Sequence, residues 1–535
     1  MGRKPTHASL ILKNGKVATL SKQRPTAEAI AILGDRILRV GSNSEVNTLI
    51  GDKTRVIDLK GKTVLPGLID AHVHIADFGR TLSWINLRRA KSIEDIKTII
   101  KIYAAGKPKE RWIIGYGWDE SRLIDKRPPR ARDLDEASPE NPTILYHHIG
   151  RKCVVNTKAL KIANITAKTE QPPDGEIEKD PESSEPTGVL HGNATDLVWR
   201  KIPQPSEDEI IEHLELALRK VLEYGITTVH WIAPSLTELN AIKKLVEKRL
   251  YMPRIRIIMP ANYISEITHV IPPTSSLDSD IKLTGAIVFV DGALAARKAA
   301  LTEPYNNGTT SGQLLYTEEE INRFMHEICR SKLQPVMHAM GDKAMEIVLE
   351  TLEKFAHEIR QNNLRPRIEQ PAVTRPELIR RMKDFNVSAS IQPLCIITEF
   401  KVWSAMENLG PRRARWLYPL KTLIFNDVNV CGGSDAPMEP INPFTQIKAA
   451  VTRQYYFEER VTLEEAFRMY TVNAAYAVGE ENLLGTIEEG KLADLIVVST
   501  NPLEVTPESL DNIKVEMTMV GGRIVYSEEE ARNLY

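Results

Sequence analysis

Two histidines separated by one residue are the part of this sequence best suited to chemistry. They are His72 and His74, within the stretch Asp-Ala-His-Val-His at residues 70–74. Residues two apart on a strand point to the same side, so both imidazoles could bind one metal ion. The pair could equally lie in water at the surface, and the short motif does not decide between these readings. The apolar run before it, residues 64–69, favours a strand end that opens onto a site.

Two residues much later in the chain could complete a hydrolytic metal site. Such a site needs nitrogen or oxygen ligands, an open position for water and a base for the water's proton. His338 ends the apolar run 334–338, and Asp435 follows the β-prone run 428–433. His338 could instead be a core histidine, and Asp435 could instead cap the next helix. An aspartate at that position could both bind the metal and accept the proton.

The elements that must position these residues alternate along the chain between β-prone runs and helical segments. This alternation is typical of parallel α/β architecture, and in a barrel of such units the carboxyl ends of the strands carry the site. Several of the predicted strands end in His, Asp, Glu or Gln. The predicted strands are residues 227–230, 254–259, 286–290, 334–338, 367–370, 387–392 and 428–433.

The two ends of the chain share a different pattern of short β-prone runs and turns, which predicts one small sheet domain built from both ends. Residues 81–202 are rich in proline, charge and turn signals, and we expect them to form an insertion over the barrel mouth that selects the substrate. The predicted domains are residues 1–66 and 486–535 for the two parts of the β-sandwich, 67–80 with 203–485 for the barrel, and 81–202 for the lid.

Composition excludes several classes of partner. The 535 residues include 70 basic and 71 acidic side chains, so no overall field attracts nucleic acid or an anionic membrane. Small-molecule substrates are expected instead. The four cysteines are far apart in sequence and indicate neither a disulfide framework nor a thiolate zinc site. No apolar run approaches the roughly 20 residues of a membrane helix or resembles a signal peptide, so we expect a soluble, cytoplasmic protein.

Several motifs, in chain order, resemble those of the amidohydrolase superfamily. They are residues 66–74, 291–294, 433–437, 473–477 and 490–497. Further stretches resemble the branch that contains N-substituted formamide deformylases and many members of unknown substrate. These are residues 117–120, 156–160, 186–190 and 299–301. Each motif is weak alone, but the ordered set spans nearly the whole chain and is specific.

The resemblance implies an α/β fold: a (β/α)₈ TIM barrel with a divalent metal, usually zinc, beside a small β-sandwich made from both chain ends. It places His72 and His74 on the first strand, His338 on the fifth and Asp435 on the eighth, as metal ligands. In that family the aspartate is also catalytic, because it shuttles the proton of the attacking water. Relatives often form homodimers, although no exposed apolar stripe in this sequence demands one.

Two departures from the family pattern bear on the number of metal ions. Ile287 replaces a lysine that usually bridges two metals, and Gln370 replaces a histidine of the sixth strand. One ion is therefore favoured over two, since an amide is a poorer zinc ligand than imidazole. Alternatively, Glu369, His230 or Lys298 restores a second site. In a third reading the site has decayed, and the barrel binds a ligand without catalysis.

A third departure concerns the substrate. Arg151 stands where relatives commonly have a histidine, and it could pair with a carboxylate or phosphate of the substrate or form an ordinary salt bridge of the lid. His148 and Asp291 are further candidates for substrate contacts. The predicted function is metal-dependent hydrolysis of a carbon–nitrogen bond in a non-peptide amide, formamide, cyclic amide or aminated ring. The alternatives are a non-catalytic binding barrel and an ester or phosphoester hydrolase.

Overall fold

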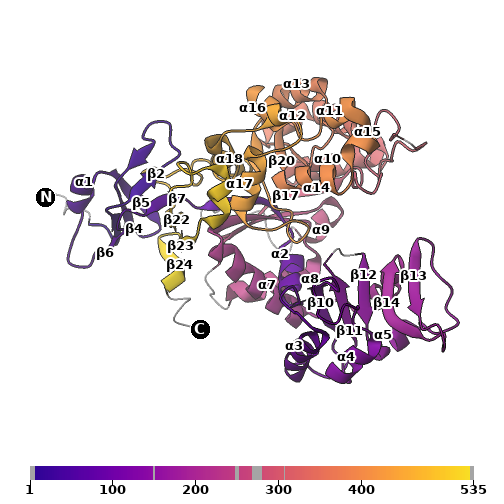
Figure 1. Ribbon diagram of the computed structural model, residues 1–535. Coiled ribbons are helices and arrows are strands. Elements are labelled where there is room, and N and C mark those ends of the chain that lie inside the picture. Colours follow the sequence, from indigo (N-terminus) through magenta and orange to yellow (C-terminus); the bar gives the residue numbers. More distant parts are fainter. Residues whose placement is uncertain (1–6, 149–150, 248–251, 268–279, 307, 530–535) are drawn as a thin grey trace. The chain divides into compact units, whose positions relative to one another are not determined.

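Eight parallel strands form the central sheet of the protein (Figure 1). The structure is a computed structural model that describes residues 7–148, 151–247, 252–267, 280–306 and 308–529. This sheet and the helices between its strands confirm the predicted (β/α)₈ barrel. In spatial order its strands are β21 (Val430–Gly432), β20 (Ser388–Ile391), β19 (Arg367–Glu369), β18 (Gln334–His338), β17 (Ile281–Phe289), β16 (Arg254–Pro260), β15 (Ile226–Ile232) and β8 (Leu68–Val73).

Backbone hydrogen bonds bring the first and last strands of the barrel together at their carboxyl ends. The N–H of Asp435 donates to the carbonyl of His72 at 2.8 Å, and the N–H of His74 donates to the carbonyl of Ala436 at 3.0 Å. His72 of strand β8 and His74, just beyond its end, are thereby held beside Asp435, which follows β21. The barrel is joined at the place where the metal site was expected.

The helices between the strands begin and pack as their sequences dictate. Helix α10 (Glu318–Arg330) starts at a capping box in which Thr317 and Glu320 bond each other's backbone, and it buries one apolar stripe against the barrel. None of the described helices combines the length and apolar character needed to cross a membrane. The other main helices of the barrel region are α2 (Ile75–Leu82), α7 (Glu207–Glu223), α8 (Leu236–Glu247), α11 (Asp342–Lys354), α13 (Pro376–Asp384), α14 (Pro393–Lys401), α17 (Pro443–Val451) and α18 (Leu463–Met469).

Two smaller sheets contain strands from the ends of the chain, which confirms the predicted β-sandwich (Figure 1). Strand β7 (Thr63–Pro66) pairs in parallel with β2 (Lys16–Ala18) and antiparallel with β22 (Leu495–Val498). The remaining strands of the two sheets are β1 (Leu10–Lys13), β3 (Thr26–Ala27), β4 (Ala29–Leu33), β5 (Arg36–Gly41), β6 (Arg55–Asp58), β23 (Val515–Val520) and β24 (Arg523–Ser527).

The apolar run at 64–69 is not one strand but parts of two, because the chain leaves the sandwich at Pro66 and enters the barrel at Leu68. Gly67 lies between them. A Cβ atom at this position would lie 2.1 Å from Oγ1 of Thr227, so only glycine allows β8 to approach β15 this closely. The Pro-Gly pair therefore marks the passage from one sheet to the other.

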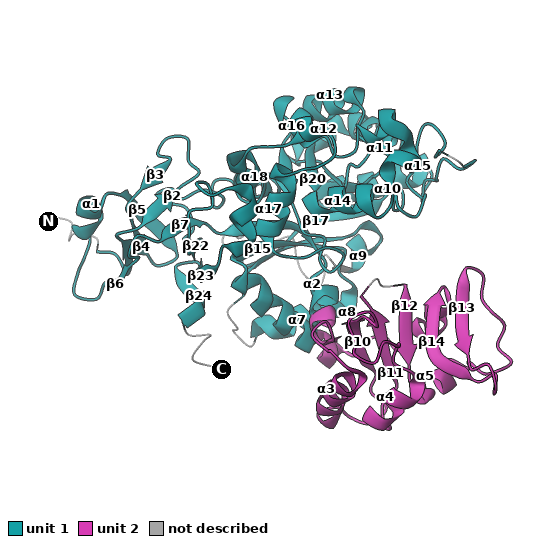
Figure 2. Ribbon diagram, in the orientation of Figure 1, with its two compact units in different colours: residues 1–79, 211–535 teal, residues 80–210 magenta. Residues whose placement is uncertain are grey.

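Residues 80–210 form a second compact unit, and residues 1–79 with 211–535 form the first (Figure 2). The second unit has its own six-stranded sheet with buried apolar clusters, rather than only turns and loops. That it covers the barrel mouth remains a prediction. Its elements are β9 (Ile85–Asn86), β10 (Ile113–Trp118), β11 (Thr143–His147), β12 (Lys152–Val155), β13 (Gly175–Lys179), β14 (Pro186–Gly192), α3 (Ile93–Ala105), α4 (Ala131–Ala137), α5 (Thr157–Ile162) and α6 (Ala194–Trp199).

Candidate metal centre

Three of the four predicted ligands meet at the carboxyl ends of the barrel strands. His72, His74 and Asp435 each offer one ligand atom, and these atoms lie within 4.8 Å of one another. Oδ1 of Asp435 is 3.4 Å from Nε2 of His72 and 3.4 Å from Nε2 of His74. His72 and Asp435 are buried, whereas His74 is partly exposed. The group therefore has an inner wall and one side toward solvent.

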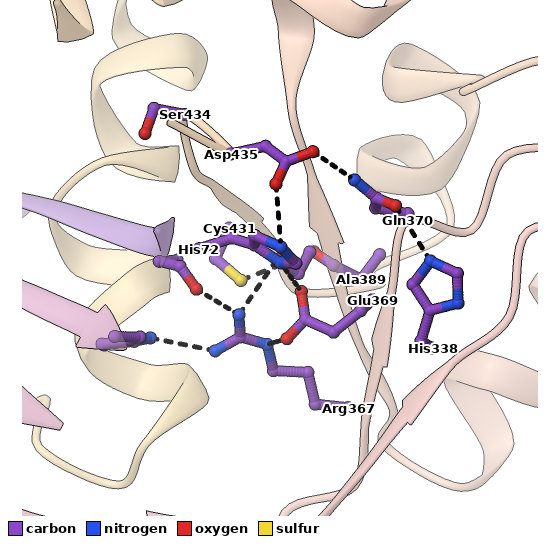
Figure 3. Close-up of polar contacts among 12 residues, drawn as sticks. His72, His338, Arg367, Glu369, Gln370, Ala389, Cys431, Ser434 and Asp435 are labelled. Atoms are coloured by element: carbon purple, nitrogen blue, oxygen red, sulfur yellow. Dashed lines mark hydrogen bonds and ion pairs between the residues drawn. The ribbon is translucent and has the colours of Figure 1, made fainter. Parts of the chain in front are cut away.

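Glu369 holds the ring of His72 from the side opposite Asp435 (Figure 3). Nδ1 of His72 lies 2.7 Å from Oε2 of Glu369, so Nδ1–H donates to the carboxylate and Nε2 is left for a metal. Nε of Arg367 lies 2.6 Å from the other oxygen of Glu369. Arg367 was not predicted as a site residue. Arg367 lies two residues before Glu369 on the same strand, so both side chains are on the same face. This spacing could have identified Arg367 from the sequence.

Gln370 connects Asp435 with His338 (Figure 3). Its side-chain amide donates to Oδ2 of Asp435 at 2.9 Å, and its carbonyl oxygen lies 3.0 Å from Nε2 of His338. Nε2 of His338 must therefore be the donor. Nδ1 of His338 lies 3.8 Å from Oδ1 of Asp291. The structure thus places His338 next to the cluster through Gln370, and its role as a fourth ligand remains a prediction.

Two of these residues have backbone conformations that are uncommon outside glycine. Gln370 has φ of +52° and Asp435 has φ of +59°, each one to three residues beyond its strand. Left-handed conformations of this kind cluster at functional sites, where the surrounding structure maintains them. Gly433 allows the chain after β21 to lie close to His72, since a Cβ atom there would lie 2.5 Å from the backbone nitrogen of His72.

The charges around His72 favour a cation. Burial by itself would lower the pKa of His72, but Glu369 and Asp435 raise it to about 10. Burial would raise the pKa of Asp435, but His72 and His74 hold it well below its usual range. Two imidazoles and a buried carboxylate in a negative environment are a donor set that zinc prefers. The residues therefore fit the divalent metal that the sequence predicts.

The candidates for a second metal site occupy other roles in this structure. His230 is buried, and its Nδ1 accepts from a guanidinium N–H of Arg367 at 2.9 Å. Lys298 is exposed in the segment after β17, where its backbone bonds Ala293. Ile287 packs into an apolar cluster with Ile232, Ile258 and Val336. Whether any of them contributes to a second site remains a prediction.

Asp291 is buried and accepts three backbone hydrogen bonds, from Ala300, Met340 and Gly341. These bonds tie the end of β17 to the turn that follows His338. Burial raises the pKa of Asp291. Its position indicates a residue that fixes the loops around His338, and a substrate contact remains a prediction.

Arg151 and His148 belong to the unit of residues 80–210. Arg151 is exposed, and its carbonyl accepts from the N–H of Gly192 at 2.9 Å. Nδ1 of His148 lies 3.6 Å from a carboxylate oxygen of Asp119. Ile149 and Gly150, which precede Arg151 in the sequence, lie outside the described residues. Contacts of Arg151 or His148 with a substrate remain predictions.

Comparisons with known proteins identify the family of this chain. The family model described as "Amidohydrolase family" matches residues 55–526. Protein LONG AFTER FAR-RED 3 of Arabidopsis thaliana is 31% identical over 97% of this chain and 92% of its own length. The N-substituted formamide deformylase of Arthrobacter pascens is 26% identical over 97% of this chain and 98% of its own. An uncharacterised metal-dependent hydrolase from Pyrococcus furiosus has a TM-score of 0.76 at 29% identity, covering 92% of this chain and all of that one.

Proposed function

The chain belongs to the amidohydrolase family and is a hydrolase, and from that premise we propose that it uses one zinc ion to cleave a carbon–nitrogen bond in a small molecule. The bond is that of a non-peptide amide, formamide, cyclic amide or aminated ring. One observation carries the proposal: His72, His74 and Asp435 converge within 4.8 Å at the carboxyl ends of barrel strands. The relative named as a formamide deformylase supports the choice of bond.

His72, His74 and Asp435 would hold the metal, and His338 would join them as a further ligand by giving up the hydrogen bond of its Nε2 to Gln370. Zinc bound there would polarise the substrate carbonyl and lower the pKa of an attacking water toward neutrality. As a carboxylate beside the two histidines, Asp435 is the group placed to take up the proton of an attacking water. It then delivers the proton to the leaving nitrogen.

The contacts of Asp435 orient its carboxylate for proton transfer. Gln370 fixes Oδ2 by a hydrogen bond, whereas Oδ1 faces the two histidines. The carboxylate is thus oriented before substrate binds, which reduces the cost of reaching the reactive geometry. His72 is oriented in the same way by Glu369.

Apolar packing supports one metal ion rather than two. A bridging lysine would stand at position 287, where the isoleucine is instead buried among Ile232, Ile258 and Val336. A charged group in that cluster would pay a large desolvation cost. On the other side of the site, Gln370 already bonds both Asp435 and His338.

Metal content is the first test. Elemental analysis of protein purified without chelator should show one zinc equivalent per chain that His72→Ala loses. His357→Ala, at an exposed histidine on helix α12 (Ala356–Gln361), is the matched control and should keep it. Two zinc ions lost together in His72→Ala would mean a two-metal barrel. A wild-type chain that binds no zinc after zinc addition would overturn the proposal.

Turnover is the second test. A panel of formamides, cyclic amides, aminated heterocycles, carboxylic esters and phosphoesters should give activity on one of the carbon–nitrogen classes. Asp435→Asn should lower that activity by about 10²–10⁴-fold, the usual contribution of a general acid–base group. Unchanged turnover in Asp435→Asn, or activity on phosphoesters alone, would contradict the assignment.

A further inference from the structure

The unit of residues 80–210 contains a second group of potential metal ligands, remote in sequence from the barrel site. Asp119, His147 and His148 each offer one ligand atom, and these atoms lie within 4.8 Å of one another. Asp119 and His147 are buried, and His148 is exposed. We propose that this group is a second divalent metal site, for zinc or a similar transition metal, independent of the barrel.

Strand register explains why these residues meet. Strands β10 and β11 run parallel, and their last residues, Trp118 and His147, are paired. The N–H of His148 donates to the carbonyl of Trp118 at 3.1 Å, so Asp119 and His148 leave the two strands side by side. Carboxyl ends of parallel strands are the common place for ligands in open α/β sheets.

The two imidazoles are close and held from several sides. Their ring centroids are 4.2 Å apart, and the ring of Trp118 packs edge-on against His147 at 4.8 Å. Oε2 of Glu120 lies 2.9 Å from Nε2 of His147. A carboxylate beside one ring nitrogen is the usual companion of a metal-binding histidine, because it fixes the ring and its tautomer.

Asp119 is fixed in the same manner. Its Oδ1 accepts the backbone N–H of Ser121 at 2.9 Å and the Ser121 hydroxyl at 2.6 Å. Its other oxygen, Oδ2, lies 3.6 Å from Nδ1 of His148. One carboxylate oxygen is therefore occupied by the turn, while the other faces the histidines.

Two cations lie near the group and must be accommodated. Lys152 contacts Oε1 of Glu120 at 2.7 Å, which leaves Oε2 toward His147. Arg122 contacts Oδ2 of Asp119 at 3.2 Å, but its side chain is 67% exposed and can move into water when a metal binds. With two imidazoles and carboxylate oxygen, the donors match zinc rather than calcium or magnesium.

Binding there would join the ends of two strands that are separate in sequence. A metal that binds only the folded unit adds to its stability, and the ligands come from residues 119, 147 and 148. The site would then strengthen the unit of residues 80–210. It requires neither the barrel metal nor turnover.

The test uses the full chain with the barrel ligands removed. In His72→Ala/His74→Ala, titration with Co²⁺ followed by its visible absorption should show one bound equivalent. Adding His147→Gln/His148→Gln should abolish this equivalent or weaken it at least tenfold, whereas adding the control His357→Ala should not. If only the barrel proposal fails, the wild-type chain and His72→Ala/His74→Ala will have the same metal content.

A single milder substitution guards against unfolding of the multiple variant. Asp119→Asn, in the His72→Ala/His74→Ala background, should weaken Co²⁺ binding about tenfold or more while the circular dichroism of the metal-free protein is unchanged. The proposal is overturned if the His72→Ala/His74→Ala chain binds no Co²⁺. It is also overturned if the bound equivalent survives the loss of both His147 and His148.

Discussion

Glu369 is buried between His72 and Arg367 and contacts both. Replacing it with glutamine removes the charge that fixes Nδ1–H of His72. We expect Glu369→Gln to lower zinc affinity about 10–100-fold, as is usual when the partner of a metal-binding histidine is changed. Competition with a chromophoric chelator measures the affinity.

Since Glu369→Gln also leaves Arg367 without its carboxylate partner, urea unfolding of the metal-free protein should accompany this measurement. Glu350→Gln, at an exposed position of helix α11, is the matched control and should change neither quantity. A zinc affinity of Glu369→Gln within twofold of wild type would show that the contact does not orient the ligand.

At the residue scale, the sequence alone predicted the histidine pair and Asp435 because local spacing and strand ends carry that information. It did not predict Arg367 as part of the site, nor that Gln370 bonds both His338 and Asp435. Those contacts join residues of different strands, and single-sequence patterns do not specify which side chains from different strands touch. Gln370 was considered as the replacement of a lost ligand and as a side chain near a possible second metal site.

Glu399 on helix α14 is a buried acid with an unfavourable environment. Burial and the nearby Glu439 raise its pKa to about 7. The folded state therefore keeps a proton that the unfolded state releases, so stability should fall as pH rises from about 4.5 to 7. We expect Glu399→Gln to remove this loss and to gain about 2–3 kcal/mol over wild type between pH 4 and pH 8.

Urea unfolding of Glu399→Gln and wild type at pH 4, 6 and 8 measures this difference. Glu350→Gln serves again as an exposed control and should show no such dependence on pH. A constant difference between Glu399→Gln and wild type across the three pH values would contradict the raised pKa.

Helix α2 depends on a glycine in its interior. Intrinsic propensity favours alanine over glycine by about 1 kcal/mol in a helix, but a Cβ atom at Gly79 would lie 1.8 Å from the carbonyl oxygen of His213 in α7. We expect Gly79→Ala to destabilise the protein by about 1–3 kcal/mol through overpacking. Because α2 begins directly after His74, zinc affinity should fall as well.

Thermal unfolding and zinc titration of Gly79→Ala check this expectation. Gly106→Ala, at the end of α3, is the control, since its nearest neighbour would be a carbonyl oxygen at 3.9 Å. Greater stability of Gly79→Ala would mean that propensity outweighs the clash.

At the element scale, the positions of the barrel strands were predicted closely because buried parallel strands are short apolar runs between helices. The segment of residues 81–202 was harder. Its sheet contains both parallel and antiparallel pairs, and the pairing of β12 with β14 and of β10 with β11 depends on contacts across loops. Turn signals are frequent in its sequence, so the short strands between them were not recognised as one sheet.

The barrel and the sandwich are connected by a buried ion pair. Nε and an Nη of Arg254 on β16 donate to the two oxygens of Asp494 at 2.8 and 3.1 Å, and both side chains are buried. Removing Asp494 leaves the buried guanidinium with the largely exposed Asp280 as a counter-ion, so we expect Asp494→Ala to cost about 3–5 kcal/mol. Urea unfolding monitored by tryptophan fluorescence measures it.

Asp280 provides the comparison, since it contacts the same guanidinium at 2.8 Å but its side chain is 66% exposed. Asp280→Ala should cost about 0–1 kcal/mol, as exposed ion pairs do. Equal losses in the two variants would show that burial of the pair does not matter.

The pairing of β7 with β2 and β22 also has a consequence for synthesis of the chain. β7 is made early, but its antiparallel partner lies about 430 residues later. At typical translation rates of about 5–20 residues per second, one edge of β7 stays open for about 20–90 s. An open strand edge can pair with other nascent chains. Until residues 495–498 leave the ribosome, this open edge of β7 is therefore a place where nascent chains can aggregate.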